Sequence, residues 1–544
     1  MGDLSILSGD SRTHQRRFMD HLLKDIQALD QMLRQGMIEK QVQRIGAEQE
    51  LCLVDEGWRP VGIGPDILDQ MHDLHLAPEL GRFNLEINLD PLLLAGNCLS
   101  AMENQLLMLL EKVKIAAGER HAKVIMTGIL PSIRIQDLTW DNMTPNPRFR
   151  TLSDRMHAFR GKDFDIFIQG IDQLIAHHSN ILYEACNTSF QVHLQVDPDA
   201  FAAKYNWAQA IAGPVLAVAA NSPLLMGKRL WHETRVALFE QSTDTRSMSN
   251  VMRQKEARVS FGSKWLRHSV MELFREDIAR HELMISAALP PDSLELLKKG
   301  EIPKLKALML HNGTLYKWNR PCYGITDGVP HLRIECRYLP AGPTTRDEMA
   351  NAAFWIGLMQ GTADYAGRID REMDFDVAKA HFIAAAREGL GAQFRWPGRG
   401  MVPARSLLLE ELIPMAREGL KQAGIAQQEI DIYMGVIEAR TEKGQSGATW
   451  LLDNYTRLLQ KGRPQEALLA VTASAWLNQE YGQPVHTWDE ARLEDVGHCT
   501  RRYAQVSEVM STDLITVRAD DPLLLVSRIM DWRRIHHVPV ADEQ

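Results

Sequence analysis

The sequence lacks the motifs that mark most nucleotide-binding and hydrolytic enzymes. It has no GxxxxGK[ST] loop and no GxGxxG, which argues against a P-loop or a Rossmann phosphate cradle. It has no HExxH and no GxSxG, and its serines and cysteines stand in no recognisable catalytic context. If the protein is an enzyme, we therefore expect its chemistry to depend on metal ions and positioning rather than on a covalent intermediate.

Cysteine is scarce and scattered along the chain. The six cysteines form no CxxC pair, which argues against a zinc ribbon or a disulfide scaffold and is typical of a reducing compartment. We therefore expect a cytoplasmic protein. The cysteines are Cys52, Cys98, Cys186, Cys322, Cys336 and Cys499.

Long apolar runs and an excess of positive charge are also lacking. The longest apolar stretch, 208–220, contains Pro214 and is too short to span a bilayer, so it is predicted to form a buried helix. The amino terminus lacks the apolar segment of a signal peptide. A net charge of −9 and a pI near 6.1 give no support to nucleic-acid binding. We expect small-molecule ligands, with no membrane and no nucleic-acid partner.

What the sequence does have is four short segments in which apolar and polar residues alternate. Strict alternation predicts β-strands, because successive side chains of a strand point to opposite faces. The segments are GAEQELCLV (46–54), RFNLEINL (82–89), SFQVHLQV (189–196) and HLRIECRYL (331–339). Strand by strand, the polar faces carry Glu48 and Glu50; Glu86 with Asn84 and Asn88; His193 with Gln191 and Gln195; and Arg333, Glu335 and Arg337.

These polar faces have two interpretations. They are either the solvent-exposed side of an antiparallel sheet or a binding surface. They carry almost no lysine, and crowded carboxylates repel one another unless cations lie between them. Glutamate suits a hard divalent cation such as Mg²⁺, and neighbouring arginines suggest an anionic ligand bound to the metal, most simply a nucleoside triphosphate. If the four strands share one sheet, its polar face is predicted to be a binding surface.

Helical patterns surround the strands and indicate an α+β fold. An amphipathic helix is predicted over 14–38, and the chain becomes mainly helical over 374–490. Two helices that follow acidic strands are predicted to begin with capping boxes, which pair Ser100 with Glu103 and Thr345 with Glu348. Three parts are expected: an N-terminal helix within 1–40, a catalytic domain over 41–490 and a separate segment over 506–544.

The segment over 506–544 reads as strand, helix and strand. It resembles the first half of a CBS domain through VMSTDLITV, a helix at 521–533 and IHHVPVADE. The second half of that motif does not follow, so we expect no intact nucleotide-binding CBS pair from this segment. We assign it no ligand residues.

Several separated motifs together resemble the glutamate–cysteine ligase superfamily, whose catalytic fold is similar to that of glutamine synthetase. The resemblance covers roughly 40–490, and the order of the motifs makes it more specific than any one of them. It rests on GAEQE, FQVHLQV, ANSPLLMG, LRIECRYLPAGP, AREGLKQAG and GATWLLDNY. It implies a curved, mainly antiparallel sheet that forms a funnel backed by helices, in which glutamates hold two or three Mg²⁺ ions, with Mn²⁺ as an alternative, over the phosphates of ATP.

Carried over by position, the resemblance assigns roles to individual residues. The implied metal ligands are Glu48, Glu50, Glu79, Glu86, His193 and Glu335. Arg337 would steady the transferring phosphoryl group, Arg235 would meet the carboxylate of the amino-acid substrate, and His193 is a ligand or a substrate contact. Asn319, Arg320 and Tyr323, in a predicted ligand-facing loop, and Arg333 are assigned to substrate or nucleotide binding.

The residue patterns leave three structural alternatives open. Glu79 is alternatively a surface residue of a loop, because its surroundings do not alternate cleanly. Arg235 is alternatively paired with Glu233 or Glu240 on a helix. His193 is alternatively a hydrogen-bonded core histidine.

The leading functional hypothesis is an ATP- and Mg²⁺-dependent carboxylate–amine ligase. It would join the γ-carboxylate of L-glutamate to L-cysteine or a related amine through an acyl phosphate, as in glutathione biosynthesis, and it is compatible with a homo-oligomer. One alternative is a nucleotide-binding regulatory or sensor protein with a CBS-like tail. Another is a metal-dependent hydrolase or phosphatase, against which the arginine-rich fourth strand weighs.

Overall fold

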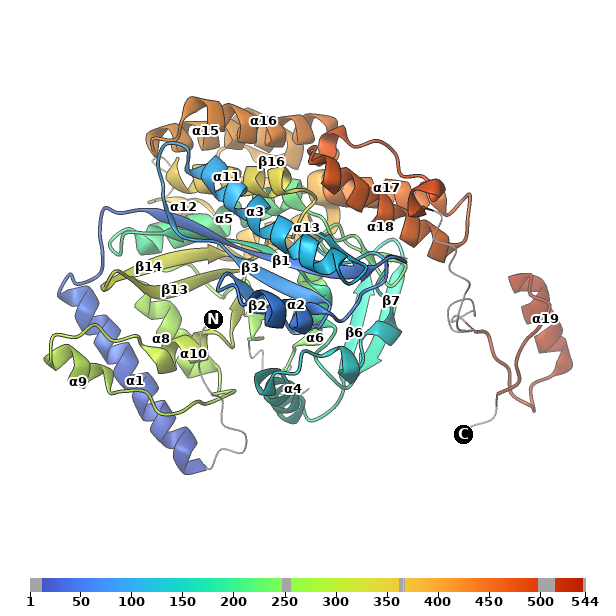
Figure 1. Cartoon of the computed structure of the whole chain (residues 1–544), viewed down its shortest axis with the longest axis horizontal. Coiled ribbons are helices and arrows are strands. Elements are labelled where there is room, and N and C mark those ends of the chain that lie inside the picture. The colour runs from blue at the N-terminus through green and yellow to red at the C-terminus, as the bar shows by residue number, and fades with distance from the viewer. Residues whose placement is uncertain (1–11, 247–255, 362–364, 366, 498–513, 542–544) are drawn as a thin grey trace. The chain divides into compact units, whose positions relative to one another are not determined.

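A computed structural model describes residues 12–246, 256–361, 365, 367–497 and 514–541 (Figure 1). The chain divides into two units, 1–497 and 498–544, which are described separately. The larger unit holds the main sheet and most of the helices, and the described residues of the smaller unit, 514–541, include one helix.

One antiparallel sheet of eight strands lies at the centre of the larger unit (Figure 1). Its strands are β1 (Arg44–Asp55), β2 (Leu76–Pro78), β3 (Asn84–Asn88), β4 (Leu92–Leu93), β5 (Ala122–Ile125), β8 (Phe190–Gln195), β13 (Asn319–Thr326) and β14 (Val329–Cys336). They follow the order β13-β14-β8-β1-β3-β2, and β4 and β5 also pair with β1. All four alternating segments lie in this sheet, which confirms the prediction of a curled, mainly antiparallel architecture.

The strand register decides which polar side chains meet. Glu50 of β1 lies opposite Glu86 of β3, and Glu335 of β14 lies opposite His193 of β8. Because side chains alternate with a period of two, slipping either pair by one residue would carry these groups to the apolar face. The apolar face is buried throughout, so the register is strongly determined.

Helices cover the apolar face of the sheet. The covering helices α3 (Cys98–Gly118), α5 (Phe201–Ala219) and α11 (Thr345–Gln360) contact its strands. Helices α13 (Phe375–Glu388), α15 (Ile413–Gln422) and α16 (Gln427–Lys443) pack onto this layer. Residues 208–219 of α5 are all buried although Pro214 lies among them, which confirms the buried helix predicted there.

The remaining elements complete the larger unit. Its other helices are α1 (Arg12–Arg34), α2 (Gly64–Met71), α4 (Pro147–Arg160), α6 (Thr234–Ser242), α8 (Met271–Arg280), α9 (Ser293–Lys298), α10 (Lys306–Asn312), α12 (Ile369–Glu372), α14 (Ala404–Leu407), α17 (Gly447–Leu458) and α18 (Pro464–Tyr481). Its short sheets pair β6 (Phe164–Gln169) with β7 (Gln173–His178), β9 (Leu224–Leu225) with β10 (Lys228–Arg229), β11 (Val259–Ser260) with β12 (Tyr316–Lys317), and β15 (Gln393–Trp396) with β16 (Gly400–Pro403). The mainly helical character of 374–490 and the N-terminal helix are as predicted. Within the described ranges, no helix combines the length and apolar character needed to cross a bilayer.

The first predicted capping box is wrong. Helix α3 begins at Cys98, so Ser100 lies inside its first turn. The N–H groups of Leu99 and Ser100 donate to the carboxylate of Glu429, each at 3.1 Å. Glu103 turns away and accepts a hydrogen bond from Arg346. A carboxylate distant in sequence therefore satisfies the free N–H groups that a local cap would satisfy.

The second predicted capping box is displaced by one residue. The hydroxyl of Thr344, not Thr345, caps α11 and accepts from the N–H of Asp347 at 3.1 Å. Glu348 instead accepts from the N–H of Gly342 in the preceding turn. The helix begins where predicted, but its cap uses the neighbouring pair of residues.

The smaller unit contains α19 (Leu523–Arg533). Val517 and Val540 form a parallel bridge on either side of this helix in the sequence. This arrangement agrees with the predicted strand, helix and strand, while 506–513 of the predicted first strand lie outside the described residues.

Helices α11 and α15 approach each other closely through glycine. A Cβ atom added to Gly419 of α15 would lie 2.0 Å from the carbonyl oxygen of Gly357 and 2.4 Å from the backbone nitrogen of Gly361. Real Cβ atoms do not come that close to backbone atoms. The layer of helices behind the sheet therefore depends on this crossing.

Replacing Gly419 by alanine is expected to destabilise the fold by about 1–3 kcal/mol, because the helices would have to separate. Denaturant unfolding measures the change. The matched control is Gly435→Ala in α16, where an added Cβ meets nothing within 4 Å. That control should be neutral or stabilising by about 0.5–1 kcal/mol. Equal stabilities of the two variants would contradict the close crossing.

Candidate active site

The polar face of the sheet is enclosed rather than exposed to solvent. Glu86 and His193 are each 8% exposed, and Glu335 is 0% exposed. A cavity of about 190 Å³ lies over this face and is bounded on one side by α4. This burial rules out the interpretation of the polar face as an ordinary solvated surface. The polar lining of the cavity includes Glu48, Glu50, Glu79, Glu86, Glu184, Arg148, Gln191 and Arg337.

Three glutamates come together in this cavity, and we call them the acidic cluster. One carboxylate oxygen each of Glu50, Glu79 and Glu86 lies within 4.8 Å of the others. Glu79 directly follows the short strand β2, which pairs with β3 and so brings it to the glutamate of that strand. The structure thereby places Glu79 in the cavity wall, in contrast to the alternative of an unrelated surface loop.

Burial and crowding shift the titration of these carboxyl groups upward. Burial, reinforced by the charges of Glu48 and Glu50, raises the pKa of Glu86 to about 7. Burial raises the pKa of Glu79 well above its usual value, and the neighbouring carboxylates reinforce the effect. The pKa of Glu184 rises to about 8, again mainly through burial. For these three carboxyl groups, burial and the neighbouring carboxylates outweigh the positive charge nearby, which for Glu184 comes from Arg337.

One arginine links the acidic cluster to the next strand. Arg337 donates from Nη1 to Oε1 of Gln191 at 2.5 Å and also to the carboxylate of Glu335. Gln191 in turn donates to Oε1 of Glu50 at 2.9 Å. Positive charge therefore lies at one edge of the acidic cavity, held in place by side chains of β8 and β14.

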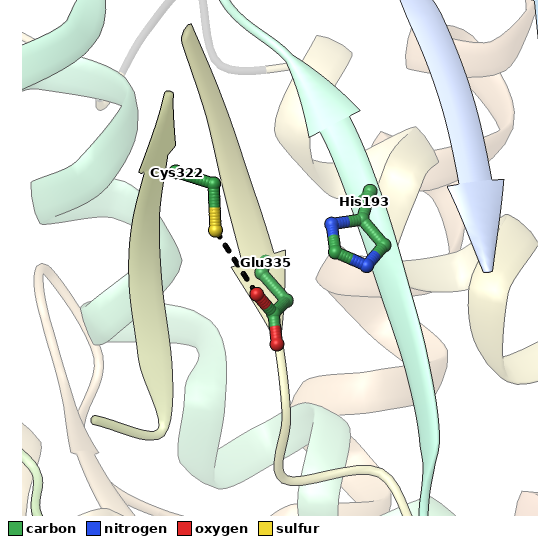
Figure 2. A group of neighbouring side chains, drawn as sticks. All are labelled: His193, Cys322 and Glu335. Atoms are coloured by element: carbon green, nitrogen blue, oxygen red, sulfur yellow. Dashed lines mark hydrogen bonds between the residues drawn. The ribbon is translucent and has the colours of Figure 1, made fainter. Parts of the chain in front are cut away.

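A second group of possible metal ligands lies beside the first, and we call it the mixed cluster (Figure 2). It consists of His193, Cys322 and Glu335, each of which offers one ligand atom within 4.8 Å of the other two. The thiol of Cys322 donates to Oε2 of Glu335 at 3.0 Å. On its other side, His193 Nε2 lies 3.0 Å from Oε1 of Glu48.

Arginines balance the charge of the mixed cluster. Arg320 donates to both oxygens of Glu335, from Nε at 2.8 Å and from Nη2 at 2.9 Å, and Arg337 donates as well. Burial opposes ionisation of Glu335, but the two guanidinium groups outweigh it and hold its pKa well below the usual range. This carboxylate is therefore ionised and paired, unlike those of the acidic cluster.

A second cavity of about 190 Å³ opens on the other side of Glu48. Arg333 lines it together with Arg44 and His331. Arg44 is paired with Glu39 at 2.6 Å, whereas no hydrogen bond or ion pair of Arg333 is found within the part of the chain that the structure describes. The basic lining suits an anionic ligand.

The predicted ligand-facing loop around WNRPCYG is corrected by the structure, because these residues form β13. Only Arg320 of the three assigned residues lies on the polar face. Asn319 points to the other side and donates to Oε1 of Gln209 at 2.6 Å. The hydroxyl of Tyr323 donates to the carbonyl of Pro303 at 2.8 Å. In this structure, neither Asn319 nor Tyr323 lines either of the two cavities at the polar face.

Arg235 is likewise placed in a structural role. It lies in α6, is 3% exposed and donates from Nε to Oε1 of Glu233 at 2.6 Å. Its Nη2 donates to the carbonyl of Tyr338, also at 2.6 Å. The structure therefore favours the ion pair with Glu233 that the sequence left open, over contact with a substrate carboxylate.

Sequence reasoning missed three residues of the site. Cys322 lies on the face of β13 that carries Arg320, so alternation would have found it had that segment been read as a strand. Glu184 comes from a single 3₁₀ turn, Glu184–Cys186, and Arg148 from the first turn of α4. Neither of these two stands in a periodic pattern that points to the sheet.

Comparisons with known proteins agree with this geometry. The model of glutamate–cysteine ligase family 2 matches residues 44–473, and that of the CBS domain matches residues 506–544. The fold is similar to that of the glutamate–cysteine ligase of Francisella tularensis in complex with AMP, with a TM-score of 0.50 and 11% identity over 84% of this chain and 97% of that one. A bifunctional glutathione synthetase from Pasteurella multocida aligns with a TM-score of 0.46 and 12% identity, over 84% of this chain and 55% of that one. The search of curated proteins found no match.

At these identities the first structural likeness supports the fold alone, and the family match carries the assignment. That match spans most of the chain and includes the four strands that build the polar face. The chain belongs to glutamate–cysteine ligase family 2.

Proposed function

We propose that the protein is an ATP- and Mg²⁺-dependent carboxylate–amine ligase that joins L-glutamate, through its γ-carboxylate, to L-cysteine or a related amine. Family membership supports an ATP-dependent ligase that acts on small molecules. The observation that carries the proposal is the acidic cluster, three glutamates gathered beside Arg337 in one enclosed cavity.

The donor set of the acidic cluster fits Mg²⁺. Its ligand atoms are all carboxylate oxygens, which a hard cation prefers, and the raised pKa values of Glu79 and Glu86 show that burial and crowding disfavour their charged forms as long as no cation is bound. Glu50, Glu79 and Glu86 would hold one ion, and Glu48 lies between this cluster and the mixed cluster, where a second ion would bind. When bound, Mg²⁺ neutralises charge on the phosphates of ATP.

Forming an amide from a carboxylate requires an activated acyl group, which an acyl phosphate supplies. Phosphoryl transfer then needs charge stabilisation and alignment more than covalent work by the protein. Arg337, held by Gln191, would steady the transferring phosphoryl group. The amine then attacks the acyl carbon, and the carbon–oxygen bond to phosphate breaks. The walls of the cavity, including α4, would limit the access of water to the acyl phosphate.

Two further arginines would position the substrates. Arg148 lines the acidic cavity directly and is suited to the carboxylate of the amino acid, the role that the sequence suggested for Arg235. Arg333 lines the second cavity, where it would meet the anionic part of the nucleotide.

The direct test is phosphate release from ATP with Mg²⁺ and L-glutamate, with and without L-cysteine and a panel of other amines. Mass spectrometry of the products identifies any amide formed. Release that depends on one amine and yields a new amide mass is the expected result. Nucleotide binding without release in the presence of any amine would overturn the ligase proposal and favour the regulatory or sensor alternative, which the CBS match motivates.

Replacing Glu86 by glutamine is expected to lower kcat by about 10²–10³-fold, because it removes charge that the proposed metal site requires. Steady-state phosphate release at saturating ATP measures the effect. Glu111→Gln, on the exposed face of α3, is the matched control and should retain full activity. Unchanged turnover in Glu86→Gln would show that the acidic cluster does not serve catalysis.

Metal binding should depend on pH. In the unfolded chain the carboxyl group of Glu86 loses its proton near its ordinary pKa, whereas in the folded protein its pKa is raised to about 7. The free energy of unfolding of the metal-free protein therefore falls as the pH rises between these two values. Mg²⁺ requires ionised carboxylates, so its apparent affinity should rise over the same range. The increase in Tm caused by Mg²⁺ should therefore grow as the pH rises toward about 7 and level off above it. In Glu86→Gln, the Mg²⁺-induced increase in Tm should change less with pH. An equal pH dependence in both proteins would contradict the assignment of Glu86 as a metal ligand.

A further inference from the structure

The mixed cluster differs from the acidic cluster in the chemistry of its donors. The acidic cluster offers only oxygen, whereas the mixed cluster offers an imidazole nitrogen, a thiol sulfur and a carboxylate oxygen. Thiolate and imidazole favour Zn²⁺ and other borderline-soft divalent ions, while Mg²⁺ favours oxygen. The two neighbouring groups are therefore suited to different metals.

The histidine of the mixed cluster is prepared to bind a metal. Nε2 lies 3.0 Å from the Glu48 carboxylate, which when ionised can only accept a hydrogen bond, so we assign the ring proton to Nε2. The opposite nitrogen, Nδ1, is buried and has no hydrogen-bond partner in the described structure. His193 as a whole is 8% exposed, and Figure 2 shows Nδ1 on the side of Glu335. A ligating histidine commonly donates its other ring proton to a carboxylate, which fixes its orientation.

We propose that His193, Cys322 and Glu335 form a binding site for Zn²⁺ or a similar borderline-soft divalent ion. These side chains come from the adjacent strands β8, β13 and β14, so the sheet holds them in place. Three protein ligands leave the fourth position of a tetrahedral ion open for water or a substrate group.

Binding replaces one hydrogen bond. The S–H bond of Cys322 breaks, its proton leaves to solvent, and a metal–sulfur bond forms while the hydrogen bond to Glu335 is lost. No electron is transferred. Zinc bonds of about 2.0–2.3 Å place tetrahedral donors roughly 3.5 Å apart. The three donor atoms already lie within 4.8 Å of one another, and the sulfur and carboxylate oxygen, now 3.0 Å apart, would have to separate slightly. Arg320 remains bound to the carboxylate and keeps it oriented.

Zinc at this site would oppose the proposed ligase reaction. His193 and Glu335 would be withdrawn from the second Mg²⁺ position, so Zn²⁺ would inhibit by competing with Mg²⁺. This consequence rests on the proposed function, whereas binding of the ion does not.

Cobalt replaces zinc at such sites and reports a thiolate ligand by its charge-transfer absorption. Titrating the full chain with Co²⁺ should produce this absorption, and Zn²⁺ should displace it while millimolar Mg²⁺ should not. Cys322→Ser should abolish the absorption and weaken Zn²⁺ binding by at least about 10–100-fold. Cys336→Ala removes a buried cysteine of the apolar face and is the matched control, in which the absorption should persist.

Absence of the absorption in the unmodified protein, or its survival in Cys322→Ser, would overturn the proposal. If Cys322→Ser does not fold, anomalous diffraction of the Zn²⁺-soaked unmodified protein decides, because density at any place other than between the three side chains excludes the site. Phosphate release with Mg²⁺ alone tests the ligase separately. A cobalt–thiolate signal without any ligase activity would uphold the zinc site and reject the proposed function.

Discussion

The register of β1 against its two neighbours is the constraint on which the candidate site depends. β1 pairs with β3 on one side and with β8 on the other, and each pairing has to keep its polar side chains on the same face. Burial of the apolar residues on the opposite face enforces that choice for all strands at once. The carboxylates therefore meet because of where the hydrophobic residues have to go, and not through attraction between them.

The carboxyl groups of the two clusters on the polar face differ in protonation. Glu335 is compensated from inside the chain by Arg320 and Arg337, and it remains ionised. Around Glu79 and Glu86 burial and the charges of other carboxylates dominate, and together they raise the pKa values of both groups. Leaving charge unbalanced in a buried cavity costs stability, and a bound cation recovers that cost. The unbalanced cluster is thus the part of the face that depends most on a ligand from outside.

Alternation predicted the fold and much of the site because it is a local consequence of burying one face of a strand. It correctly put Glu48, Glu50, Glu86, His193 and Glu335 on the polar faces of their strands. The register in the structure then brings Glu50 opposite Glu86, and His193 opposite Glu335. It failed where partners distant in sequence decide the outcome. Glu429 satisfies the start of α3 although it lies 330 residues further along the chain. The carbonyl of Tyr338, 103 residues away, helps to hold Arg235 beside Glu233. The sequence pattern did not predict β13 as a strand for another reason: the segment NRPCYG contains a proline, and proline is uncommon within strands.

That proline-containing strand shows how one position changes the chemistry of a shared scaffold. Cys322 lies two residues from Arg320 on the same face, so its sulfur reaches the carboxylate that the arginine already holds. An oxygen-bearing side chain there would make the second cluster similar to the first and would favour Mg²⁺ at both. With sulfur present, selectivity depends on which ion is available and on the proton that the thiol has to give up. The strand positions the donors, and the identity of a single donor then decides which metal they suit.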